Sequence, residues 1–189
     1  MGGFGEGGLS ASSLPVPPGP VLPTCIFFEL VTLFQTYSDA NHGGCKDSGR
    51  STSAYVVKIG TGIVSWMLKH QPIVALSTTE AKYVAACEAG KEIVWMRELL
   101  QEIGFESNGP STLHMDNQSA IQVAKHPEHH GRMKHLNLHW YWLQNIVDKG
   151  IISPHFISTL DMPADLLTKA LPRVKVQHIC SLLGLGPVN

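Results

Sequence analysis

Two runs of β-branched and aromatic residues are followed by a long stretch of helical periodicity, and this succession most limits the folds open to the chain. The runs, at 54–59 and 63–68, flank Gly60-Thr61-Gly62 and predict an antiparallel hairpin, because glycine permits a tight turn. Residues 79–103 then place apolar side chains at steps of three and four, including Ala86, Ile93 and Ile103, which predicts a helix with one buried face. A hairpin followed by such a helix predicts a sheet with a helix packed on it.

The remaining chain alternates between strand and helix patterns. Strands are expected at 33–38, 111–115 and 151–157. Helices are expected at 117–125, 136–149, 163–170 and 174–183. An antiparallel beginning followed by strands separated by helices predicts the α/β class, with a mixed sheet and helices on both faces.

Glycine and proline dominate the first part of the chain. Such a segment buries too little apolar surface to offset the entropy lost on ordering, so residues 1–31 are predicted to be a disordered leader. The rest, 32–186, is long enough for one domain with a hydrophobic core.

Charge and composition exclude several classes of protein. The chain has 14 basic and 15 acidic residues, a formal charge of −1, so it is no globally basic nucleic-acid coat, although a local basic patch is compatible with it. It contains no apolar run long enough for a membrane span and no signal peptide. Its four cysteines are scattered, which favours reduced thiols. We expect an intracellular, non-secreted monomer without a membrane partner.

Four acidic residues are expected where strands end or helices begin: Asp39, Glu80, Asp116 and Asp165. Strand ends that share one edge of an α/β sheet converge on a crevice. Carboxylates gathered there repel one another, and divalent cations relieve the repulsion; oxygen ligands favour Mg²⁺ or Mn²⁺ over zinc. The alternative is that each acid caps a helix or complements its dipole.

Short strings of residues around these acids carry a family resemblance. The chain resembles the ribonuclease H domain of copia-type LTR-retrotransposon Pol polyproteins, from about residue 36 to 186. The strings, in family order, are Tyr37-Ser38-Asp39-Ala40, Arg50-Ser51-Thr52-Ser53, Ser65-Trp66, Val74-Ala75-Leu76-Ser77-Thr78-Thr79-Glu80-Ala81, Tyr83-Val84-Ala85-Ala86, Lys91-Glu92-Ile93-Val94-Trp95-Met96-Arg97, Met115-Asp116-Asn117-Gln118-Ser119-Ala120, Arg132-Met133-Lys134-His135, Ala164-Asp165-Leu166-Leu167-Thr168-Lys169 and Leu182-Leu183-Gly184-Leu185.

This resemblance implies a ribonuclease H-like fold, a five-stranded mixed sheet flanked by helices. It implies an endonuclease that cleaves the RNA strand of RNA–DNA hybrids with two Mg²⁺ ions, Mn²⁺ being an alternative. In this interpretation Asp39 bridges both ions, Glu80 and Asp116 hold the ion on the scissile-phosphate side, and Asp165 helps to hold the ion that positions the water.

Side chains near these acids are candidates for contact with the hybrid. Asn117 and Gln118 directly follow Asp116, and Arg50 and Lys69 lie near the hairpin, although a solvated surface is the alternative for each. His135 is a candidate for assisting proton transfer. The histidines from 126 to 139 are interpreted as a polar loop and helix face rather than a zinc site. Trp95 is expected in the core.

The chain also departs from the family. Lys82 stands where the Thr-Glu-Ala-Glu-Tyr string has its second glutamate, and no reverse transcriptase domain precedes the match. Two hypotheses therefore remain: a polyprotein fragment with hybrid endonuclease activity, whose missing partner is a reverse transcriptase domain, and a catalytically inactive transposon remnant or nucleic-acid-binding module. An integrase-type site is disfavoured, because Glu80 is second in the order of the acids rather than last.

Overall fold

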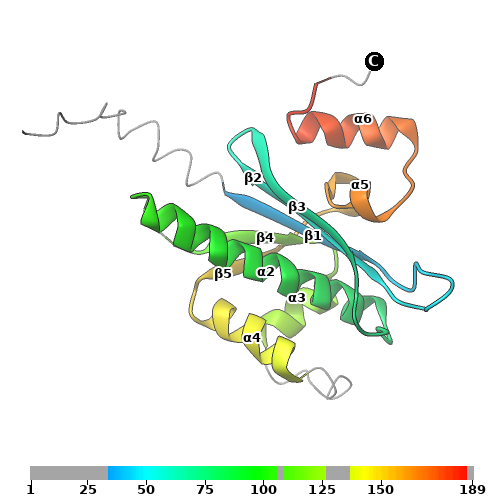
Figure 1. The fold of residues 1–189 in the computed structure, drawn as a ribbon, viewed down its shortest axis with the longest axis horizontal. Coiled ribbons are helices and arrows are strands. Elements are labelled where there is room, and N and C mark those ends of the chain that lie inside the picture. Colours follow the sequence, from blue (N-terminus) through cyan, green and yellow to red (C-terminus); the bar gives the residue numbers. More distant parts are fainter. Residues whose placement is uncertain (1–33, 106–108, 127–136, 187–189) are drawn as a thin grey trace, which may run out of the picture.

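The computed structural model describes residues 34–105, 109–126 and 137–186, with the backbone alone for 137–140. Its sheet has five strands in the order β3-β2-β1-β4-β5 (Figure 1). Strand β1 pairs with β2 and β2 with β3 in antiparallel fashion, whereas β1 with β4 and β4 with β5 are parallel. The mixed five-stranded sheet expected from the sequence is confirmed. The strands are β1 Gln35–Asn41, β2 Thr52–Ile59, β3 Gly62–His70, β4 Ser111–Met115 and β5 Ile152–Phe156.

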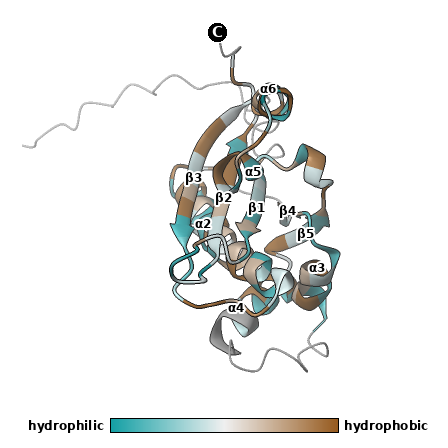
Figure 2. Ribbon diagram, turned by 90° about the vertical axis from the view of Figure 1, so that its right-hand side faces the viewer, coloured by the Kyte–Doolittle hydropathy of each residue, from teal (hydrophilic) through white to brown (hydrophobic). Residues whose placement is uncertain are grey.

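Helices cover both faces of this sheet, as expected (Figures 1 and 2). Tyr55 and Val57 of β2 belong to the main core together with residues of helices α2, α3 and α4, whereas Ala54 and Val56 contact the segment around α5 and α6 on the other face. The alternation follows from the twofold repeat of a strand. The helices are α2 Thr78–Glu102, α3 Gln118–Lys125, α4 Asn137–Asp148, α5 Asp165–Thr168 and α6 Arg173–Leu182, with a 3₁₀ turn, η3, at Thr159–Asp161.

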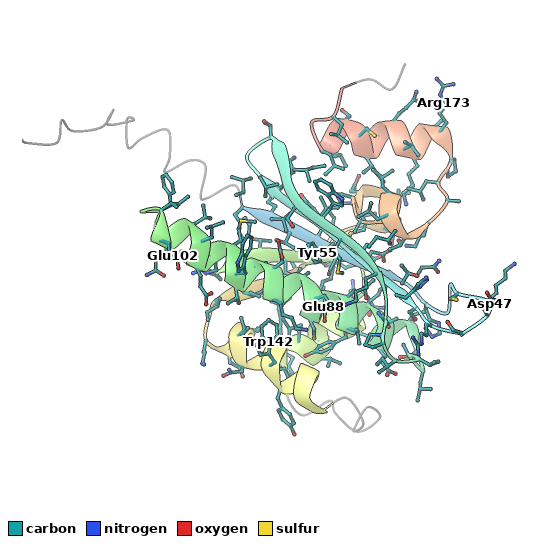
Figure 3. All side chains as sticks on the ribbon, viewed as in Figure 1. Asp47, Tyr55, Glu88, Glu102, Trp142 and Arg173 are labelled. Atoms are coloured by element: carbon teal, nitrogen blue, oxygen red, sulfur yellow. The ribbon has the colours of Figure 1, made fainter. Side chains whose placement is uncertain are left out.

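Helix α2 is held by its cap and by its packing on the sheet. The hydroxyl of Ser77 accepts the backbone N–H of Glu80 at its N-terminus. Midway along, Tyr55 lies beside α2 (Figure 3) and donates its hydroxyl to Glu92 Oε2 at 3.0 Å. Gly90 of α2 lies so close to Trp142 and Leu143 of α4 that a β-carbon there would touch both. Helix α2 is therefore fixed against both the sheet and α4.

The last turns of α2 differ from the expectation. Trp95 is expected in the core and Ile103 on the buried face, but they are 53 % and 59 % exposed. A helix of 25 residues is about 37 Å long, whereas a five-residue strand such as β4 spans about 17 Å, so the end of α2 with Ile103 extends beyond that strand. Trp95 is exposed for another reason: its neighbours Ile93 and Met96 are buried, so Trp95 lies on the opposite side of the helix.

Strand β1 also runs further than expected, to Asn41 instead of residue 38, so that Asp39 lies within the strand rather than at its end. The reason is the partner strand: β2 continues to pair as far as Thr52 opposite Asn41. On the other side, pairing with β4 stops at Ser38 opposite Met115. Beyond this point β1 pairs with a strand on one side only. The helix expected at 163–170 is reduced to the four residues of α5.

Candidate active site

Three of the four candidate acids meet beside the part of β1 that pairs with β2 alone. Asp39 lies on β1, Asp116 directly follows β4, and Asp165 begins α5. One carboxylate oxygen of each lies within 4.8 Å of the others. Their side chains are 0 to 3 % exposed. Segments far apart in the sequence thus form one buried carboxylate cluster, by which we mean Asp39, Asp116 and Asp165.

Glu80 is not among these three. It is buried at 1 % exposure, and its Oε2 accepts the backbone N–H of Leu76 at 2.9 Å. This contact, with the Ser77 cap, satisfies backbone donors at the start of α2. In the described structure Glu80 therefore stabilises the N-terminus of the helix, and a role in metal binding stays a prediction.

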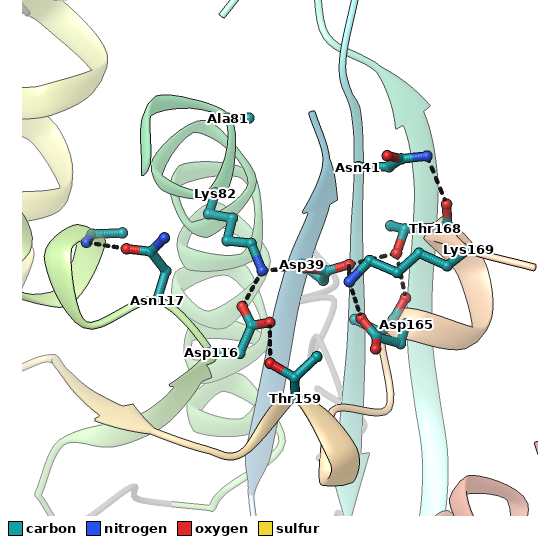
Figure 4. A network of polar contacts seen from close by, with 12 residues as sticks. Asp39, Asn41, Ala81, Lys82, Asp116, Asn117, Thr159, Asp165, Thr168 and Lys169 are labelled. Atoms are coloured by element: carbon teal, nitrogen blue, oxygen red, sulfur yellow. Dashed lines mark hydrogen bonds and ion pairs between the residues drawn. The ribbon is translucent and has the colours of Figure 1, made fainter. Parts of the chain in front are cut away.

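Lys82, two residues further along α2, reaches the cluster instead. Its ammonium donates to Asp39 Oδ1 at 2.9 Å and also to Asp116 Oδ1, so that it bridges the two carboxylates (Figure 4). Residues two positions apart on a helix point to different sides. Glu80 and Lys82 therefore do not both face the cluster, and here Lys82 does.

Two further lysines reach the cluster from the other side. The Lys169 ammonium bridges Asp165 Oδ1 at 2.5 Å and Asp39 Oδ2 at 3.1 Å. Lys175 at the start of α6 binds Asp165 Oδ2 at 2.5 Å. Three ammonium groups therefore face the three carboxylates of the cluster, equal in number and opposite in charge.

These contacts determine how Asp39 ionises. Burial of the carboxylate opposes ionisation, but the Lys82 ammonium, the hydrogen bond from Thr168 and the Lys169 ammonium outweigh it and lower the pKa of Asp39 to about 2. The Thr168 hydroxyl donates to Asp39 Oδ2 at 2.5 Å. Asp39 is therefore a carboxylate at neutral pH, held in place by partners from α2 and from the segment around α5.

The donor chemistry of the cluster suits a hard divalent cation, because it consists of carboxylate oxygens. The contacts that the cluster makes here do not suit a divalent cation, since each of the six carboxylate oxygens already accepts a hydrogen bond or forms an ion pair within the protein. A cation would have to displace at least one ammonium group. The donors are Lys82 to Asp39 Oδ1 and Asp116 Oδ1, Thr159 to Asp116 Oδ2, Thr168 and Lys169 to Asp39 Oδ2, Lys169 to Asp165 Oδ1 and Lys175 to Asp165 Oδ2.

The predicted hybrid contacts lie at different places. Asn117 uses its Oδ1 to accept the N–H of Ala120 at 2.8 Å and so caps α3 beside the cluster. Gln118, Arg50 and Lys69 have exposed side chains. His135, like His129 and His130, lies outside the described residues.

Sequence reasoning did not assign Lys82 to the site, and the helical repeat does not single it out. Steps of four residues back along α2 reach Lys82 from Ala86 but Glu80 from Val84, and Glu80 itself is buried. Nor does the sequence indicate the contact of Lys175 with Asp165, because this contact depends on how α6 packs.

Comparison with known proteins finds relatives of this sequence. Over 153 residues, 81 % of the chain, it is 39 % identical to the retrovirus-related Pol polyprotein from transposon TNT 1-94 of Nicotiana tabacum. Over 152 residues it is 36 % identical to the Pol polyprotein from transposon RE1 of Arabidopsis thaliana. The chain is homologous to a segment of retrovirus-related Pol polyproteins from transposons. This confirms the resemblance, and no family model matches. The chain spans about a tenth of the length of these relatives, 11 % and 10 %.

Solved structures give distant likenesses. Ribonuclease H1 from Halobacterium salinarum covers 71 % of this chain, with 92 % of its own length matched, at 17 % identity and a TM-score of 0.44. LC11 ribonuclease H1 in complex with an RNA/DNA hybrid covers 71 % of this chain, with 92 % of its own length matched, at 16 % identity and a TM-score of 0.46. Among the described residues no helix is long and apolar enough to cross a membrane.

Proposed function

We propose that the chain acts on RNA–DNA hybrids as an endonuclease of the ribonuclease H type and cleaves the RNA strand. The observation that carries this proposal is the meeting of Asp39, Asp116 and Asp165, whose oxygens lie within 4.8 Å of one another. A buried carboxylate with a perturbed pKa, as Asp39 has, is a candidate for a functional site. The homology to transposon Pol polyproteins supports a nucleic acid as the substrate.

Phosphodiester hydrolysis at such a site is assisted by divalent cations, in the two-ion form that the sequence resemblance implies. We propose Mg²⁺ or Mn²⁺ as these ions, with the carboxylate cluster as the ligands and Glu80 as a fourth carboxylate. The ammonium contacts described above oppose this, and so does the contact of Glu80 with Leu76. The proposal therefore requires these contacts to be given up when the site is loaded.

Recognition of the hybrid is proposed for Asn117, Gln118, Arg50 and Lys69. A hybrid differs from duplex DNA in its 2′-hydroxyls and in the shape of its minor groove, so polar side chains matter more than a large basic field. Asn117 supports this proposal best, because it caps α3 one residue after Asp116. The proposed setting is inside the cell, beside a reverse transcriptase domain.

A second candidate function is binding of the hybrid without cleavage. It is favoured by one observation, the ammonium groups of Lys82 and Lys169 inside the carboxylate cluster. They leave the polar surface around the site intact but occupy the oxygens that hydrolysis needs.

One experiment tests the proposal and separates the two candidates. The full chain is incubated with a hybrid labelled on the RNA strand, with Mg²⁺ and in parallel with Mn²⁺, beside Asp116→Asn as the control. Proposed activity predicts slow cleavage of the RNA strand alone, lost in Asp116→Asn. Retention of the hybrid in a gel-shift assay without cleavage supports the second candidate. Equal binding of hybrid and duplex DNA without cleavage refutes both.

A further inference from the structure

Lys82 is the least exposed of the three lysines that face the carboxylate cluster. Its side chain is 14 % exposed, against 32 % for Lys169 and 20 % for Lys175. It also comes from α2, the helix that is fixed against the sheet and against α4. Displacing its ammonium therefore requires a larger disturbance than displacing the other two.

The position of this ammonium is the one that a shared cation would need. It lies between Asp39 Oδ1, at 2.9 Å, and Asp116 Oδ1. A Mg²⁺ ion bound to both oxygens would lie about 2 Å from each. Ion and ammonium would then overlap, and two cations so close in a buried site repel each other strongly.

Lys82 also differs from Lys169 in its sequence context. Lys169 ends Ala164-Asp165-Leu166-Leu167-Thr168-Lys169, a string in which the chain agrees with the family it resembles, whereas Lys82 departs from the family string. We therefore take the bridge from Asp39 through Lys82 to Asp116 as the contact to test.

We propose that the Lys82 ammonium is the resident cation of the carboxylate cluster and competes with divalent ions for it, which weakens their binding and slows the proposed cleavage. Its positive charge stabilises Asp39 and Asp116 without any bound metal, and its bulk fills the space between them. Removal of this one ammonium opens the cluster to Mg²⁺ or Mn²⁺. This inference about Lys82 deepens the proposed function. The predicted effect on cleavage rests on the proposed function, whereas the predicted effect on metal binding does not.

Binding of Mn²⁺ to the full chain tests this directly, because free Mn²⁺ gives an electron paramagnetic resonance signal that disappears on binding. The variants are Lys82→Gln, which removes the charge, and Lys82→Glu, which adds a fourth carboxylate. Lys91→Gln is the matched control, since Lys91 lies on the same helix but pairs with Glu88 at the surface, at 2.7 Å. Lys82→Gln combined with Asp116→Asn tests whether new binding uses the cluster.

We expect no Mn²⁺ uptake by the unchanged chain or by Lys91→Gln in the range where Lys82→Gln binds. The dissociation constant should be lower in Lys82→Gln by at least about a hundredfold. At 1.4 kcal/mol for each factor of ten, that is about 3 kcal/mol, the low end of the cost of breaking a buried ion pair. The gain should be lost in the double variant. The melting temperature of Lys82→Glu should rise with Mg²⁺, and that of the unchanged chain should not.

Two results overturn the proposal. Uptake of Mn²⁺ by the unchanged chain as tight as by Lys82→Gln shows that the ammonium is no obstacle. Absence of uptake by the variants, when circular dichroism shows them folded, shows that something else closes the cluster. The hybrid assay separates this inference from the proposed function. Variants that bind Mn²⁺ but leave the hybrid intact support the inference and refute the proposed activity. Cleavage of the hybrid by the unchanged chain at the same rate as by the variants supports the proposed activity and refutes the inference.

Discussion

Acidification should destabilise this chain through Asp39, because its folded-state pKa of about 2 lies below the ordinary value of 3.8. Between these values the unfolded chain binds a proton that the folded chain does not, so stability rises with pH in this window. The contribution of Asp39 is thus fully present above about pH 5 and is lost as the pH falls through the folded-state pKa.

The expected magnitude follows from the shift. A difference of nearly two pKa units at about 1.4 kcal/mol each gives about 2 kcal/mol at neutral pH. Roughly two thirds of this should be gone at about pH 2.5, where the unfolded carboxylate is protonated and the folded one only in part. Burial at 0 % exposure means that solvent screens little of this contribution.

Urea unfolding of the full chain and of Asp39→Asn, followed by circular dichroism at about pH 6 and about pH 2.5, measures this difference. The isosteric amide carries no titrating proton, so the stability gap between the two proteins should shrink by about 1 to 2 kcal/mol on acidification. Asp47→Asn, in the exposed loop after β1, controls for the general loss of a carboxylate. A gap of equal size at both pH values would refute the claim that the ammonium groups hold Asp39 ionised.

Three further substitutions test the packing that supports the site, each by its urea midpoint. Gly184→Ala should cost about 1 to 3 kcal/mol, because Gly184 has a φ of 71° and a β-carbon there would collide with the carbonyl oxygen of Thr61. Ser77→Ala should cost about 1 kcal/mol through loss of the α2 cap, whereas Ser77→Asp should retain most of it. Ile93→Ala, in the core at 0 % exposure, should cost about 2 to 5 kcal/mol. Costs near zero in all three would mean that the described packing does not hold the fold.

The hairpin and helix α2 could be predicted because their information is local. Glycines mark the turn between β2 and β3, and helical periodicity with a Ser77 cap marks α2. The extension of β1 to Asn41 could not be predicted, because it depends on pairing with β2 across a loop. The exposure of Trp95, by contrast, follows from the helical repeat, because Trp95 lies opposite the face of α2 that carries Ile93 and Met96.

The candidate site was predictable in its acids more than in their partners. Asp39, Asp116 and Asp165 stand in motifs that order them along the chain, and the structure brings them together. The choice between Glu80 and Lys82 depends on the rotation of α2 about its axis, and the helical repeat does not decide it because the first turns of α2 are buried on several sides. The approach of Lys175 depends on the docking of α6, which is a tertiary contact.

The bridge formed by Lys82 has a consequence for how this sequence could change. Carboxylates packed together repel one another unless cations are supplied, so a carboxylate cluster of this kind destabilises the fold that carries it. With lysine at position 82 the chain supplies the charge itself, and its shape should withstand a chelator. Lysine and glutamate codons differ at their first base alone. A single nucleotide substitution therefore separates a self-sufficient fold from one with a fourth carboxylate beside the cluster, which would depend on ions from its surroundings.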